Sequence, residues 1–419
     1  MNPDLMRQYL AGRRTSRRAA LRIAGAAGVL GASAVAGVPT ASAAGAPAPA
    51  GPGKPGDRFD DALFDYSDPA NLADWAPSRY GADDQRGALN EVTPEKTAAA
   101  LGLVRSGAVR TYNLGELMYN GFPAAGSGIR RSYEQRLTVS GYQPPQGFQD
   151  EGGVLFTTDP LGTNKLSYHE ERFAGEVFPN HSEPLSTTFQ IGSQLDNLNH
   201  IGSGDFFYNG LRGPDVARGH GTAKLGSENV GPVVTRGVLL DVLGVKLAKG
   251  QVGDLAEPAS NGEPLLRENY RITVADLVEA MDFGRIKAIE PGDAVLLRTG
   301  WHQLLVRRDP GDVARWQAPH GMPGIYVREA RWLSQFRPAI IGSDTWALEV
   351  LGSPVNEDGA IFPVHQELMM RHGIRIGESY VLDDLAEDGV HEFVFAVTPQ
   401  FSEGATAGNT TPLALAQRR

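Results

Sequence analysis

The chain has 419 residues, a length that is enough for one large domain or two ordinary ones. Of these residues 41% are hydrophobic, and the formal net charge is −10. It contains no cysteine, so disulfides, thiolate metal ligands and a cysteine nucleophile are excluded. A chain this acidic, without a basic stripe, is not expected to bind nucleic acid or an anionic membrane surface.

The first 43 residues are typical of a twin-arginine export signal. Arg17 and Arg18 precede an apolar, Ala- and Gly-rich run over 23–38, and Ala41, Ser42 and Ala43 offer a small-residue cleavage site. The run is shorter than the roughly twenty residues that span a membrane. We therefore expect export to the periplasm, cell envelope or exterior, with cleavage near Ala43 or, alternatively, retention as an uncleaved anchor.

Cleavage near residue 43 would remove six arginines and one aspartate, which takes the net charge from −10 to −15. Residues 44–57 are almost entirely Ala, Pro and Gly, so they predict a linker that buries little apolar surface. We expect a single large domain over 58–408, with no membrane contact after cleavage, and a C-terminal tail over 409–419.

The body predicts a mixed α/β fold in which helices pack against a sheet. Strand-like runs occupy 108–114, 133–139, 153–157, 185–195, 233–243 and 294–298. Helical patterns occupy 274–281, where Thr273 can act as the N-cap, and 328–336 and 364–371.

Residues 190–200 carry polar side chains at every second or fourth position. If this segment is extended, one face presents the four residues Gln190, Gln194, Asp196 and His200. A capping or hydrogen-bonding role is the simpler interpretation of such residues at a strand end. The chain lacks the Gly-x-Ser-x-Gly, Walker, Gly-x-Gly-x-x-Gly and His-Glu-x-x-His motifs, so a site must be assembled from separated residues.

A second informative stretch covers 363–379. Leu368 and Met369 place His365 on the buried side of a short helix, which Gly373 ends, and a strand then leads to Glu378. A buried histidine or glutamate needs a partner, which can be a backbone group or a functional ligand.

These residues resemble the cyclase family that contains bacterial kynurenine formamidase and isatin hydrolase. Its motif His-x-Gly-Thr-His-x-Asp-x-Pro-x-His is matched in length by 190–200, with Gly192, Asp196 and His200 in common. Further similar blocks follow in family order at 75–90, 291–301, 323–325, 342–345 and 365–378. The resemblance implies a swivelling β/β/α fold and a homo-oligomer.

By this resemblance, Asp196, His365 and Glu378 would be metal ligands and His200 the catalytic acid/base. Gln190 and Gln194 stand where the family has histidines, and zinc seldom uses amide oxygen. Three outcomes stay open: a hard divalent ion such as manganese with amide oxygens among its ligands, zinc on the three surviving ligands, or no metal.

The implied function is metal-dependent hydrolysis of a small amide, formamide or lactone, an arylformamidase-like reaction at a C–N or cyclic ester bond. The alternative is an extracytoplasmic small-molecule binding protein, or a pseudoenzyme, on the same scaffold. His302, His320 and Trp346 lie within or beside family blocks and are candidates for the substrate pocket, although packing is the more common role of such residues.

Overall fold

The computed structural model describes residues 59–105, 107–124, 131–140, 154–156, 165–169, 172–173, 176–177, 180–352 and 362–417. The predicted export signal and linker lie outside these residues. Within them, none of the helices combines the length and the apolar character that a membrane crossing requires.

The described residues divide into two compact units, one within 135–185 and the other made of 59–134 and 186–417. In the first unit, the sheet order β4-β5-β3-β8 is built from β3 (Thr138–Ser140), β4 (Val154–Phe156), β5 (Lys165–His169) and β8 (Asn180–Ser182). A small hairpin joins β6 (Arg172–Phe173) to β7 (Glu176–Val177). β2 (Tyr133–Gln135) pairs with β9 (Leu185–Thr187) where the chain passes between the units in sequence.

The second unit is built on a nine-stranded sheet with the order β1-β19-β17-β13-β14-β15-β16-β10-β18. Its strands are β1 (Val109–Asn113), β10 (Gln194–Asp196), β13 (Val233–Asp241), β14 (Ala294–Arg298), β15 (Ile340–Ser343), β16 (Arg375–Glu378), β17 (Glu392–Val397), β18 (Ala407–Asn409) and β19 (Leu413–Gln417). β13 to β16 run parallel, and antiparallel strands flank them on both sides. The outer strand β11 (Ala217–Arg218) pairs separately with β12 (Gly221–Thr222).

Both faces of the central sheet are buried, as is usual for parallel strands. Along β14, Val295 and Leu297 join the core on one face, whereas Ala294 and Leu296 join the core on the other. This alternation follows the two-residue period of a strand. The mixed α/β fold expected from the sequence is therefore present, with the long apolar strands at its centre.

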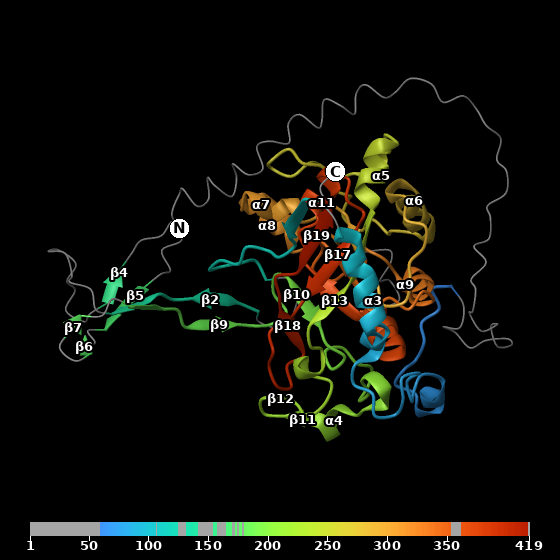
Figure 1. Cartoon of the computed structure of the whole chain (residues 1–419), viewed down its shortest axis with the longest axis horizontal. Helices are drawn as coiled ribbons and strands as arrows, with labels where there is room; N and C mark the ends of the chain where they lie inside the picture. The colour runs from blue at the N-terminus through green and yellow to red at the C-terminus, as the bar shows by residue number, and fades with distance from the viewer. Residues whose placement is uncertain are drawn as a thin grey trace. The chain divides into compact units, whose positions relative to one another are not determined.

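Helices cover the sheet on both faces. α3 packs against β13 and β17, and α6, α9 and the helix that carries His365 pack against the opposite core (Figure 1). The α-helices are α3 (Pro94–Leu101), α4 (Gly213–Val216), α5 (Val242–Ala248), α6 (Val274–Gly284), α7 (Gln303–Val306), α8 (Pro310–Trp316), α9 (Val327–Ser334), α10 (Pro363–His365) and α11 (Asp383–Glu387). The π-helix η8 (Gln366–Arg371) continues α10, and short 3-10 turns are η2 (Pro69–Asp74), η3 (Gly87–Glu91), η4 (Gly102–Val104), η5 (Tyr208–Gly210), η6 (Ser227–Asn229) and η7 (Val252–Asp254).

Most of the predicted helices and strands are present, and some of them end at other residues than predicted. The helix expected at 274–281 is α6, with Thr273 as the N-cap in a capping box. The strand expected at 233–243 ends at Asp241, because the carboxylate of Asp241 accepts from the backbone N–H of Gly244 at 2.9 Å and starts α5. Residues 413–417, in the segment expected to be a tail, form β19 between β1 and β17.

The continuous strand expected at 185–195 is wrong. The segment forms β9 and β10, separated by a bend. Gly192 lies in the bend with φ +64°, close to the side chain of Met118. The left-handed conformation favours glycine, and the chain turns where the polar stripe was expected to continue.

The first described residues bind to Arg331 on α9 and to Glu367 on η8, the helix that continues α10. The guanidinium of Arg331 donates to the Asp60 carboxylate at 2.8 Å and to Glu367 at 3.1 Å, and Tyr66 donates its hydroxyl to Glu367 at 2.7 Å. Burial raises the pKa of Glu367, but its hydrogen bond to His372 and the nearby Arg331 and Arg371 outweigh burial and lower it to about 2. We call residues 60–66 the N-terminal clasp.

Candidate metal centre

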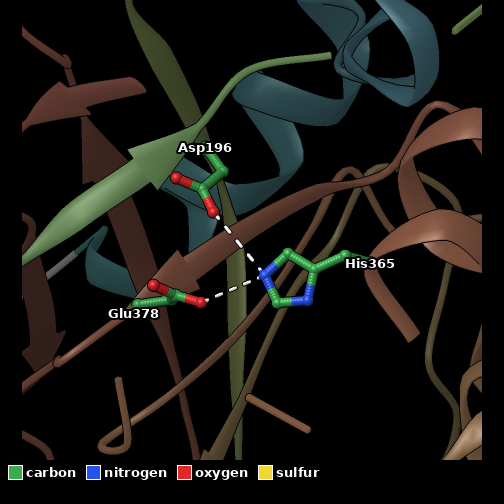
Figure 2. Close-up of side chains that lie close together, drawn as sticks. All are labelled: Asp196, His365 and Glu378. Atoms are coloured by element: carbon green, nitrogen blue, oxygen red, sulfur yellow. Dashed lines mark hydrogen bonds and ion pairs between the residues drawn. The ribbon is translucent and has the colours of Figure 1, made fainter. Parts of the chain in front are cut away.

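Three ligand-type side chains meet on the neighbouring antiparallel strands β10 and β16 and the helix α10. Asp196 ends β10, Glu378 ends the adjacent β16, and His365 reaches between them from α10 (Figure 2). One donor atom from each lies within 4.8 Å of the others, and all three side chains are buried. The structure thus brings together the three residues that the resemblance names as metal ligands.

The inner atoms of the cluster face one another. Nε2 of His365 lies 3.2 Å from Oε1 of Glu378 and 3.7 Å from Oδ2 of Asp196. Donors that each lie about 2.1 Å from one ion are about 3 to 3.5 Å apart when they are neighbours in its coordination shell. Oδ2 of Asp196 is buried without a hydrogen-bond partner among the described residues. The donor chemistry and the unpartnered oxygen fit a divalent cation.

Gln194 holds the outer oxygens of the same two carboxylates. Its Nε2 amide donates to Oε2 of Glu378 at 2.5 Å and to Oδ1 of Asp196 at 3.3 Å. Its Oε1 is buried without a hydrogen-bond partner among the described residues. In this arrangement Gln194 binds the two carboxylates through its amide N–H groups.

Gln190 lies apart from the cluster. Its Nε2 donates to the hydroxyl of Thr406 at 2.8 Å and lies 3.5 Å from Nδ1 of His200. Nε2 of His200 lies 3.8 Å from Oδ2 of Asp196. His200 therefore borders the cluster through Asp196, and Gln190 borders it through His200.

Burial and the neighbouring charged groups shift the pKa values of the residues in and beside the cluster. Burial, together with the neighbouring Glu378, raises the pKa of Asp196 to about 6 against the opposing effects of His200 and His365. Burial lowers the pKa of His365, but hydrogen bonds to Glu349 and Glu378 outweigh it and raise the pKa to about 10. Burial lowers the pKa of His200, so its neutral form is favoured at neutral pH.

Glu349 is a site residue that the sequence did not suggest. It is fully buried, and its Oε1 lies 2.5 Å from Nδ1 of His365. Its only sequence signal is its position seven residues after the family-like Gly342-Ser343-Asp344-Thr345 block begins.

A small pocket opens beside the cluster, with room for about one water molecule in this structure. Gln190, Gln194, Glu378 and Ser379 supply its polar lining, and Phe122, Trp316 and Trp346 supply aromatic side chains. Trp346, a predicted pocket residue, donates its indole N–H to the backbone oxygen of Trp316 at 2.8 Å.

The other two predicted pocket residues lie elsewhere. His320 is exposed and does not line this pocket among the described residues. His302 is buried in a separate ionic cluster, with Nδ1 2.9 Å from Asp383 and Nε2 3.2 Å from Glu116. The resemblance identified the sequence blocks in or beside which His302 and His320 lie, but it did not predict where their side chains point.

The His302 cluster predicts a pH dependence of stability. Burial lowers the pKa of His302, but Glu116 and Asp383 outweigh burial and raise it from 6.5 to about 10. A raised histidine pKa stabilises the fold fully below pH 6.5, and this contribution is lost as the pH rises to about 10. We expect urea denaturation to show a decline of a few kcal/mol across this window. In Glu116→Gln the decline should end at a lower pH, and an unchanged profile would contradict the pairing.

Removing the Gln194 amide should weaken metal binding without removing a ligand. Gln194→Leu keeps the volume roughly constant and leaves the outer oxygens of Asp196 and Glu378 without their donor. We expect the divalent-ion affinity, measured by chelator competition, to fall about tenfold. Gln303→Leu is a matched control, since Gln303 is also buried and its amide oxygen accepts from Asn261 at 2.8 Å. An equal loss of affinity in both variants would show a general effect of buried-amide removal.

Comparisons with known proteins define the class. A family model described as "Putative cyclase" matches residues 138–350, half of the chain. The protein therefore belongs to the cyclase family, as the resemblance predicted. The match includes Asp196, His200 and Glu349 and ends before His365.

One solved structure extends the likeness beyond that range, to 82% of the chain. A structure described as a novel cyclase is 27% identical, covers 82% of this chain and 98% of its own, and has a TM-score of 0.61. Isatin hydrolase A from Ralstonia solanacearum is 17% identical with a TM-score of 0.48, covering 74% of this chain and 92% of its own. Isatin hydrolase A from Labrenzia aggregata, bound to benzyl benzoate, is 16% identical with a TM-score of 0.47. The match covers 77% of this chain and 99% of that structure's chain. No curated protein matches the chain.

Proposed function

We propose that this protein is a metal-dependent hydrolase of a small amide, formamide or lactone. The observation that carries the proposal is the convergence of three buried carboxylates on one imidazole. His365 lies 2.5 Å from Glu349, 3.2 Å from Glu378 and 3.7 Å from Asp196. Three carboxylates around one histidine favour a divalent cation, because burying such charge without compensation is costly.

Asp196, Glu378 and His365 would hold the ion, and two carboxylates would balance its charge. With a divalent ion held by these residues, the site would supply a water of lowered pKa and polarisation of a carbonyl group. Either zinc or manganese suits two carboxylate oxygens and one imidazole. Gln194 would act by aligning the carboxylates, in place of the amide-oxygen ligation expected for Gln190 and Gln194.

His200 would accept the proton of the attacking water and deliver it to the leaving amine or alkoxide. Burial favours its neutral form, which has one ring nitrogen available to accept a proton. Its position next to Asp196, and outside the three-residue cluster, suits proton transfer beside the ion. The pocket beside Gln194 and Glu378 has room for about one water molecule, which is the size of the attacking nucleophile.

The test combines metal analysis with a substrate screen. The protein, purified without chelator, is analysed for zinc and manganese and assayed on amides, formamides, lactones and isatin, before and after chelator treatment and with each metal restored. We expect near-stoichiometric metal and chelator-sensitive hydrolysis. Bound metal without hydrolysis of any compound in the screen would contradict the hydrolase. The absence of both bound metal and hydrolysis would support the alternative, a small-molecule binding protein.

We also propose that this activity lies outside the cytoplasm, on the basis of the twin-arginine segment alone. Replacing Arg17 and Arg18 by lysine should retain the protein in the cytoplasm, as measured by fractionation. Equal export of this variant would contradict the route.

A further inference from the structure

We infer that Glu349 is a positioning residue, which fixes the imidazole of His365 in the orientation that presents Nε2 to the cluster. The inference rests on the proposed metal site. Oε1 of Glu349 lies 2.5 Å from Nδ1 of His365, and Glu349 is fully buried. A neutral imidazole carries one N–H, so an N–H at Nδ1 donated to Glu349 leaves the lone pair on Nε2. Nε2 is the atom that faces Glu378 and Asp196.

The same carboxylate also holds the backbone from which His365 projects. It accepts from the backbone N–H of Val364 at 3.2 Å and from that of His365 at 3.3 Å. These N–H groups open a helix, where they have no partner within the helix. Phe362 occupies the N-cap position in a left-handed conformation without a capping side-chain hydrogen bond, and Pro363 has no N–H. Glu349 thus supplies the cap from a different segment and binds the main chain and side chain of one ligand together.

The segment before Glu349 is itself held in an unusual conformation. Leu348 has φ +59°, a region that a non-glycine residue occupies at an energetic cost. Two backbone hydrogen bonds to Ile325 hold residues 348–350. The N–H of Ile325 donates to the oxygen of Leu348 at 3.2 Å, and the N–H of Val350 donates to the oxygen of Ile325 at 2.9 Å. Backbone strain of this kind is typical of functional sites, and here it immediately precedes the residue that contacts His365.

The experiment measures metal binding separately from turnover. Cobalt(II) is titrated into the metal-free full chain, and the affinity and visible absorption spectrum are compared for the wild type, Glu349→Gln and Glu349→Leu. Gln keeps an acceptor for Nδ1–H without the charge, and Leu removes the acceptor. Glu329→Gln is the matched control, since Glu329 is also buried and its carboxylate pairs with Arg271.

We expect Glu349→Gln to weaken cobalt binding about tenfold and Glu349→Leu about a hundredfold, the range found when partners of ligating histidines are removed. The absorption bands should shift in both variants, and Glu329→Gln should leave affinity and spectrum unchanged even if it unfolds at a lower temperature. If Glu349→Leu does not fold, the cobalt affinity and spectrum of Glu349→Gln are sufficient to test the inference.

Cobalt affinity and spectrum within twofold of the wild type in Glu349→Gln would overturn the inference, and so would a wild type that binds no cobalt, zinc or manganese. Failure of the proposed hydrolase has a different signature. In that case the wild type binds metal and Glu349→Gln weakens it, but no substrate is hydrolysed.

Discussion

Asp196→Asn is expected to lose the divalent ion and the hydrolytic activity together. The substitution keeps the size of the side chain and an oxygen that can accept from Gln194, but it removes the charge from the oxygen that faces His365. Removing the partner of a ligating residue costs about 10- to 100-fold in metal affinity, so loss of a ligand charge should cost more than about a hundredfold. Metal content after dialysis and turnover in the restored metal measure both effects.

The same variant should be more stable than the wild type when both are metal-free. Burial and Glu378 raise the pKa of Asp196 from 3.8 to about 6. A raised carboxyl pKa means that the ionised group destabilises the fold above this range, so its removal should gain roughly 1 to 3 kcal/mol at pH 7. Chemical denaturation of both proteins in chelator measures this difference. Asp312→Asn is a control at a buried aspartate outside the cluster, and retained metal in Asp196→Asn would contradict the ligand role.

His200→Ala should lower turnover by a large factor and leave the metal in place. General acid/base groups contribute typically 10²- to 10⁴-fold, so turnover should fall by that factor while metal content and melting temperature change little. His200 is outside the group of donor atoms that lie within 4.8 Å of one another, which is why metal binding should survive.

His391→Ala is the matched histidine control, since His391 is half-buried and bonds to the backbone oxygen of Leu239 at 3.2 Å. Turnover within threefold of the wild type in His200→Ala would show that the proton is transferred by another group. Loss of metal in that variant would instead make His200 a ligand.

The residues of the cluster were predictable because each lies in a strong local pattern. His365 sits on an apolar helical face, and Glu378 follows two alternating isoleucines, so their burial follows from the sequence. Their convergence with Asp196 depends on β10 pairing beside β16, which local patterns do not specify. The order of the family-like blocks supplied that information.

The hydrogen-bonded surroundings of the cluster were not predictable. The alternation of polar residues over 190–200 suggested one extended face, but the bend at Gly192 directs Gln190 toward Thr406 and leaves Gln194 at the cluster. Glu349 follows no periodic pattern, because its role depends on a left-handed residue and a contact with a helix that begins 14 residues later. The helix α3 was also missed, since its alanine-rich sequence carries a weak amphipathic signal.

The N-terminal clasp sets a boundary for proteolytic processing. Tyr66 and Asp60 bind the network around Glu367, which lies on the turn after His365. Removal of the chain up to residue 59 leaves every one of these contacts in place, whereas a cut within 60–66 takes a hydroxyl and a carboxylate from a buried network. A protease that cuts beyond Asp60 would therefore remove a contact to the network beside the histidine, and a cut beyond Tyr66 would remove both contacts.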